Sequence, residues 1–158
     1  MSTASRVAPS VPIVIVSPNI TLKTGDTVAL QADNQKYWSR INRGDTDPIE
    51  AAKETIDPFT RFVVTVQENS RIVLQADNGK YLSRINRGST NPIEAAKASV
   101  DPFCLFTVTT LSNGELVLCA DDGLFLSRIN RGDRNPIEAA KQQIDVFCQS
   151  KVTIIIGK

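Results

Sequence analysis

Two short polar segments of this sequence carry side chains that could bind a ligand, and each segment occurs three times without change. The first, "SRINRG", begins at residues 39, 83 and 127, and the second, "PIEAAK", begins at residues 48, 92 and 136. The planar guanidinium of arginine binds carboxylates with two parallel hydrogen bonds, and the asparagine amide both donates and accepts. This set of residues is suited to sugar hydroxyls or carboxylates.

The candidate ligand-binding residues are the polar side chains of these segments that a hairpin does not need in order to fold. They are Asn42, Arg43, Glu50, Asn86, Arg87, Glu94, Asn130, Arg131 and Glu138, with Trp38 as a neighbouring aromatic. They could form three equivalent carbohydrate sites or one composite site.

A structural role for the same residues is the alternative. Arg40 or Arg43 would then pair with Glu50 across one hairpin or with the neighbouring repeat, and Asn42 would hydrogen-bond the turn backbone. Hairpins that meet around a threefold axis bring like charges close together and need such satisfied networks. The sequence leaves both interpretations open.

The elements that position these residues repeat with them, at a spacing of 44 residues. The repeats are residues 27–70, 71–114 and 115–158, and residues 1–26 form an arm in front of them. Such a fixed period indicates a fold built from equal supersecondary units.

Each unit has the pattern of four short strands. In the first copy they are "TVALQAD", "KYWSRIN", "PIEAAK" and "RFVVTVQ", with alternating apolar residues between Asn, Gly, Asp and Pro. The stretch "DPIEAAKETIDPF" also resembles a helix start, but it is short for a stable helix, so we expect a strand or one helical turn there. Twelve short strands in three units predict an all-β fold, a β-trefoil, in which six strands form a barrel and three hairpins close one end.

Two stretches add a resemblance to known families. "NGKYLSR" resembles the start of a fascin-type trefoil unit, and "AAKETIDPFTRFVVT" is similar to the amaranthin-type agglutinin domain. The agglutinin resemblance implies carbohydrate binding, in a family that pairs domains or subunits to build its site. It does not assign sugar contacts to individual residues here.

Composition narrows the class of function. The net charge of +1 provides no field to attract nucleic acid or an anionic membrane, and the absence of histidine argues against an enzyme or a metal site. The three cysteines form no metal-ligand or disulfide pattern, so we expect reduced thiols and a cytoplasmic location. We expect no cofactor, no signal peptide and no membrane insertion.

The arm adds one expectation about assembly. Residues 1–12 have the composition of a disordered segment, whereas residues 13–16 and 20–22 are apolar and β-prone. They would either cover the barrel or add a strand to another chain, which would make a homodimer.

These observations favour a non-catalytic lectin that binds glycans or glycoproteins at up to three sites on the hairpin cap. The first alternative is a fascin-like scaffold for actin or another protein. The second is a trefoil protease inhibitor that acts through one loop.

Overall fold

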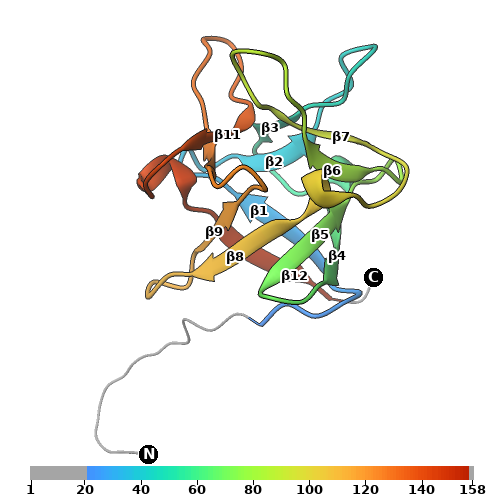
Figure 1. Cartoon of the computed structure of the whole chain (residues 1–158), viewed down its shortest axis with the longest axis vertical. Coiled ribbons are helices and arrows are strands. Elements are labelled where there is room, and N and C mark those ends of the chain that lie inside the picture. Colours follow the sequence, from blue (N-terminus) through green and yellow to red (C-terminus); the bar gives the residue numbers. More distant parts are fainter. Residues whose placement is uncertain (1–20, 157–158) are drawn as a thin grey trace, which may run out of the picture.

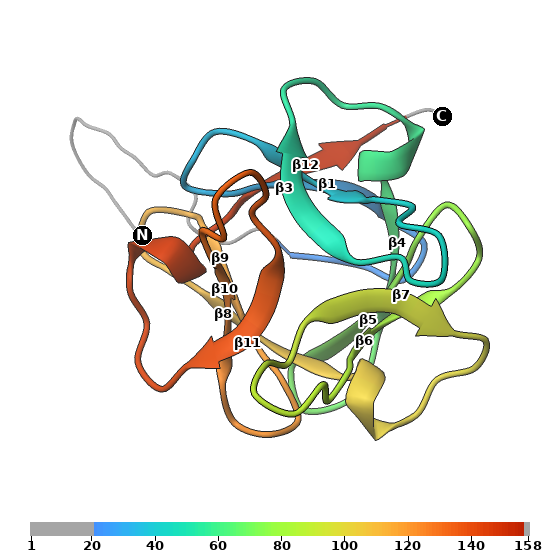
Figure 2. The same ribbon diagram turned by 90° about the horizontal axis from the view of Figure 1, so that it is seen from above.

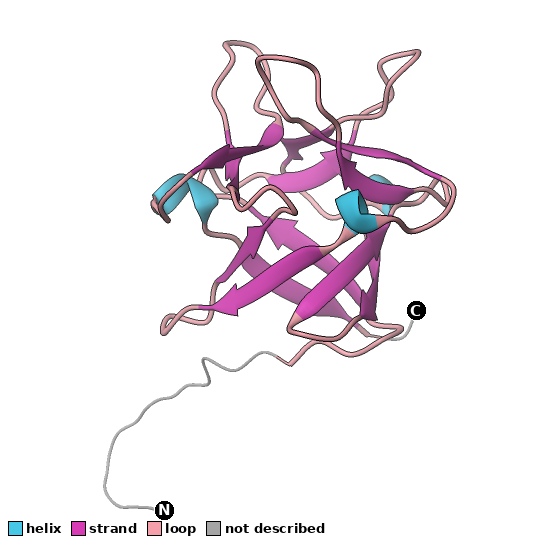
Figure 3. Cartoon of the chain, viewed as in Figure 1, coloured by secondary structure: helices cyan, strands magenta, loops and turns pink. Residues whose placement is uncertain are grey.

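The computed structural model describes residues 21–156, which fold almost entirely into short β-strands (Figures 1 and 3). The first four strands are β1 (Thr27–Gln31), β2 (Tyr37–Arg40), β3 (Ile49–Lys53) and β4 (Phe62–Val66). The next four are β5 (Arg71–Gln75), β6 (Tyr81–Arg84), β7 (Ile93–Lys97) and β8 (Phe106–Thr110). The last four are β9 (Leu116–Cys119), β10 (Phe125–Arg128), β11 (Ile137–Lys141) and β12 (Lys151–Ile155). Residues 13–16 and 20 of the predicted arm segments, and the dimer through them, lie outside the described residues.

Six of the strands form a closed antiparallel barrel. Strand β1 pairs with β4 and β12, β5 pairs with β4 and β8, and β9 pairs with β8. The ring closes between β9 and β12, where the backbones of Leu116 and Ser150 exchange hydrogen bonds of 2.8 and 3.0 Å. Closure leaves no free barrel edge, as the predicted architecture requires.

The barrel interior and the buried side chains of the six remaining strands form one hydrophobic core, which follows from the alternation in the sequence. Side chains at every second position of a strand face the same side, so each copy sends its apolar residues inward. The largest side chains that are fully buried include Phe62, Phe106, Leu74, Leu82, Leu126 and Ile49. Burying each of these contributes roughly 1.5–3 kcal/mol relative to leaving it exposed.

The remaining strands form three hairpins that together cover one end of the barrel (Figure 2). The hairpin cap consists of β2 with β3, β6 with β7, and β10 with β11. All three copies have the same register, with Ser39 opposite Glu50 in the first, and the same irregularity after the first paired residue. Both polar segments therefore lie in the cap.

The stretch "DPIEAAKETIDPF", for which we expected a strand or one helical turn, contains a strand followed by such a turn. Residues Ile49–Lys53 form a strand, as predicted, and a single 3-10 turn follows at Pro58–Thr60. The Asp57 carboxylate starts this turn by accepting a hydrogen bond of 2.9 Å from the Phe59 amide. The other copies have equivalent turns at Pro102–Cys104 and Val146–Cys148.

Candidate functional site

The strongest polar contacts of the cap are three ion pairs, one within each hairpin. The guanidinium of Arg43 binds the Glu50 carboxylate through Nε and Nη2, both at 2.7 Å. The same two-point contact joins Arg87 to Glu94 and Arg131 to Glu138, at 2.6 to 2.7 Å. The sequence had left open whether Arg40 or Arg43 pairs with this glutamate, and it is Arg43.

These pairs are buried on the acidic side and exposed on the basic side. The Glu50 side chain is 3% exposed and that of Arg43 is 37% exposed, with closely similar values in the other copies. Hydrogen bonding to Glu50 raises the pKa of Arg43 above its ordinary value, so the guanidinium stays charged. Nη1 of each arginine has no protein partner among residues 21–156 and can donate to a ligand.

The asparagines of "SRINRG" serve the turn backbone. Oδ1 of Asn42 accepts a hydrogen bond of 2.9 Å from the Gly44 amide, and Asn86 and Asn130 make the same contact in their copies. Gly44 has a φ of +91°, a conformation that side-chain-bearing residues rarely adopt. The asparagine and glycine together form an Asx turn, so they are fixed for a structural reason.

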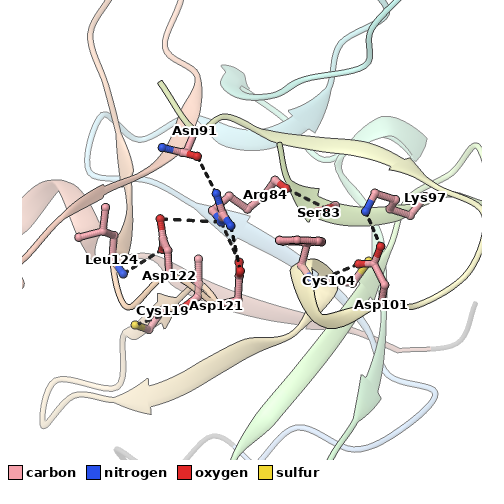
Figure 4. A network of polar contacts seen from close by, with 12 residues as sticks. Ser83, Arg84, Asn91, Lys97, Asp101, Cys104, Cys119, Asp121, Asp122 and Leu124 are labelled. Atoms are coloured by element: carbon pink, nitrogen blue, oxygen red, sulfur yellow. Dashed lines mark hydrogen bonds and ion pairs between the residues drawn. The ribbon is translucent and has the colours of Figure 1, made fainter. Parts of the chain in front are cut away.

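The first arginine of each segment joins one repeat to the next. Arg84 binds both carboxylate oxygens of Asp121, at 2.7 and 2.9 Å, and also donates to Oδ1 of Asn91 (Figure 4). Two equivalent contacts complete the ring, from Arg40 to Asp77 and from Arg128 to Asp33. The sequence suggested a contact of this arginine with the neighbouring repeat as one alternative, but not its aspartate partner, although the three aspartates share one repeat position. We call these contacts the inter-repeat clasp.

Aromatic rings lie beside the clasp in every copy. The Phe59 ring has the Arg40 guanidinium 5.4 Å and the Lys53 ammonium 4.9 Å from its centre, and Phe103 and Phe147 have equivalent cations. Each of these rings remains 41% exposed. They stabilise the clasp by cation–π contact and occupy the outer side of the cap.

The hairpins also contact one another directly around the pseudo-threefold axis. The backbone amide of one alanine in each of β3, β7 and β11 donates a hydrogen bond of 2.9 Å to a backbone carbonyl of a neighbouring repeat. These bonds run from Ala51 to Asn135, from Ala95 to Asp47 and from Ala139 to Asn91. Bridges pair Pro48 with Glu94, Pro92 with Glu138, and Glu50 with Pro136. The three copies therefore form one continuous surface around the axis.

A polar pocket of about 380 Å³ lies where the hairpins meet. We call it the cap pocket, and its walls come from all three repeats. It is lined by Arg43, Thr46, Pro48, Glu50, Arg87, Thr90, Pro92, Glu94, Arg131, Arg134, Pro136 and Glu138. Its size falls within the range of small-molecule sites.

The pocket brings together six of the ten predicted site residues. The three arginines and three glutamates line it, whereas Asn42, Asn86 and Asn130 do not. Trp38 is 3% exposed and part of the core, so its ring offers no face to a ligand. Its indole Nε1 has no hydrogen-bond partner in the part of the chain that the structure describes.

Three lining residues were missed because they vary between the copies. Thr46, Thr90 and Arg134 hold the same position of the three turns and line the pocket together. In the sequence this position is flanked by other changes, from "DTD" to "STN" and "DRN". Only the folded cap shows that the variable position faces the axis.

Other kinds of site find little support in residues 21–156. No group of three or more histidine, cysteine, aspartate or glutamate side chains there could hold a metal ion. Among the described residues, no helix has the length and apolar composition needed to cross a bilayer. All three cysteines are free, and burial raises the pKa of each thiol.

Solved structures with the same architecture identify the fold. A designed threefold-symmetric protein, ThreeFoil, superposes with a TM-score of 0.70 at 17% identity, covering 80% of this chain and 96% of its own. The BEL β-trefoil gives 0.69 at 13% identity, covering 87% and 98%. This protein is a β-trefoil. No protein-family profile and no curated protein sequence matches it.

One similar structure has a bound glycan. The Polyporus squamosus lectin, solved with the epitope Neu5Acα2-6Galβ1-4GlcNAc, gives a TM-score of 0.68 at 10% identity. The match covers 85% of this trefoil and 50% of the lectin chain. At such identities the likeness concerns the fold alone, because one fold supports many functions.

Proposed function

We propose that this trefoil is a non-catalytic carbohydrate-binding protein whose ligand enters the cap pocket. The observation that carries the proposal is the pocket itself, a polar concavity built from all three hairpins at the axis. Arginine forks and threonine hydroxyls are donors and acceptors suited to sugar hydroxyls. A solved lectin with the same fold supports the class of ligand.

Of the two expected arrangements, three equivalent sites or one composite site, the pocket supports the composite one. The proposed residues of the three copies converge on one pocket instead of lying in three separate ones. A single glycan would therefore contact side chains from all three repeats. Binding to a multivalent surface would need a second copy of the chain or a second surface of this one.

A glycan array tests the proposal with a cap variant designed to keep the fold. Replacing the asparagines would remove the Asx turns and confuse folding with binding. We instead choose the double variant T46V/T90V, which removes two pocket hydroxyls while preserving side-chain shape. The matched control is T65V/T109V, which makes the same change on β4 and β8 of the barrel.

We expect the wild-type protein and the barrel control to bind the same glycans, and the cap variant to bind them at least ten-fold more weakly. Each ligand group left unpaired costs about 1–3 kcal/mol, and the loss at two positions together exceeds the roughly 1.4 kcal/mol that corresponds to ten-fold. If the cap variant binds glycans as tightly as the wild type, the binding site lies outside the pocket. Absence of glycan binding by the wild type would reject carbohydrate binding and favour the scaffold or inhibitor roles, which co-sedimentation with actin and protease assays can separate.

A further inference from the structure

The three copies differ at the rim of the cap pocket, and these differences are electrostatic. Four arginines and three glutamates line the pocket, so its lining has one net positive charge. The glutamates are at most 6% exposed, whereas their arginine partners are 37% to 45% exposed. A ligand therefore meets guanidinium groups, with the carboxylates beneath them.

The added positive charge comes from the third turn. Arg134 lines the pocket where the other copies have threonine, and its side chain has no ion-pair partner among the described residues. Arg131 lies in the same turn, and its backbone amide donates a hydrogen bond of 3.0 Å to the backbone carbonyl of Arg134. Two cationic side chains thus project from one turn toward one pocket.

The second turn lacks a carboxylate that the other two provide. Hydrogen bonding to Glu94 raises the pKa of Arg87, and the charge of Asp45 from the first repeat adds a smaller effect. Hydrogen bonding to Glu50 likewise raises the pKa of Arg43, with a smaller effect from Asp133 of the third repeat. The residue that corresponds to these two aspartates in the second repeat is Ser89. Serine carries no charge, so the second turn contributes no carboxylate to the rim of the cap.

We propose that the cap pocket is selective for acidic glycans and holds one carboxylate or sulfate group at Arg131 and Arg134. This inference rests on the proposed function and specifies its ligand class. Free Nη1 donors and an unpaired guanidinium suit a planar carboxylate or a sulfate oxygen pair. The sugar ring would then contact Thr46 and Thr90 on the opposite side of the axis.

Isothermal titration calorimetry with 3′-sialyllactose, 3′-sulfolactose and lactose tests the charge preference, alongside an array with matched neutral, sialylated, sulfated and uronic acid glycans. The two acidic probes distinguish a carboxylate from a sulfate as the preferred group. We expect the acidic member of a matched pair to bind at least ten-fold more tightly than the neutral one. We also expect a stoichiometry of one glycan per chain.

Three variants lower the net charge by one each and differ in position. R134T restores the threonine of the other copies inside the pocket, and S89D restores their aspartate next to the pocket residue Thr90. R61T removes an exposed arginine at the start of β4, outside the pocket, and is the matched control. The first two should weaken acidic-glycan binding about ten-fold and so reduce the preference over the neutral glycan, and R61T should leave that preference as in the wild type.

Each contrary outcome has a separate meaning. Equal affinity for acidic and neutral glycans, a stoichiometry of three, or an equal effect of R61T would overturn the charge selectivity while leaving carbohydrate binding in place. Failure of the wild type to bind either member of any pair would instead reject the proposed function, and the charge selectivity with it.

Discussion

The inter-repeat clasp allows one substitution to be compared in three nearly identical settings. Asp33, Asp77 and Asp121 each bind an arginine side chain that is 11% exposed, with two hydrogen bonds of 2.7 to 2.9 Å. Replacing each aspartate with asparagine keeps the shape and removes the charge. What differs is the charge that remains beside the arginine.

The remaining charge sets the expected order of destabilisation. In D33N, Arg128 retains only the neutral Asn135, so a mostly buried guanidinium loses its counter-charge. Breaking such a pair costs about 3 kcal/mol. In D77N, Arg40 keeps the Asp47 carboxylate at 2.7 Å, so the loss is closer to that of charged hydrogen bonds, about 1.5 kcal/mol.

The third variant should fall between these two. In D121N, the Asp122 carboxylate remains 3.8 Å from Arg84, too far for a hydrogen bond but close enough to offset part of the charge. The expected loss is about 2 kcal/mol. The three copies thus provide a graded series within one fold.

Urea unfolding at pH 7 measures the series, with the fluorescence of the single tryptophan, buried Trp38, as the probe. The urea midpoint should be highest for D77N, lower for D121N and lowest for D33N, while the denaturant slope stays constant. D45N, at an exposed aspartate of the first turn, is the control and should stay near the wild type. Losses that agree within about 0.5 kcal/mol, or a largest loss in D77N, would refute the role assigned to the remaining charge.

Three further measurements follow from the same structure. Hydrogen bonding to arginine or lysine lowers the pKa of Asp77, Asp101 and Asp145 below the ordinary 3.8. Their stabilisation is therefore present above that value and is lost as pH falls through the lower folded values, so urea midpoints should be level above about pH 5 and decline below about pH 4. Q35G should raise the free energy of unfolding by about 0.5–1 kcal/mol, since Gln35 has a φ of +71° where Gly79 has +80°, and G79Q should lower it. Ellman's reagent should modify the native thiols slowly and Cys119 first, because burial raises the pKa of all three and Cys119 is the least buried.

The fold was predictable from the sequence because its period is local and repeated. Alternating apolar residues and turn residues recur every 44 positions, so three weak strand signals support one another at each element. The strand after Pro48 was harder to predict, because its residues favour a helix when considered alone. Pairing with β2 and contact with two neighbouring hairpins decide in favour of the strand, and both are tertiary effects.

The site was predictable only in part. Arg43 and Glu50 were identified by their repetition, but the same repetition drew attention to Asn42, whose role is local to the turn. Trp38 was included among the candidate ligand-binding residues, yet its position is occupied by Leu82 and Leu126 in the other copies, and all three are buried. That alignment was the signal for a core residue.

The unchanged and the varied residues of the cap have different physical tasks. Identical ion pairs and Asx turns give three hairpins one geometry, and that geometry creates a pocket on the axis. A pocket with perfect threefold symmetry would accept a sugar in three equivalent orientations, because each wall would present the same donors. Ser89 and Arg134 remove that equivalence, so an acidic glycan has one orientation that is favoured over the other two. On this reasoning the residues that differ between repeats determine the selectivity, and those that do not differ maintain the scaffold.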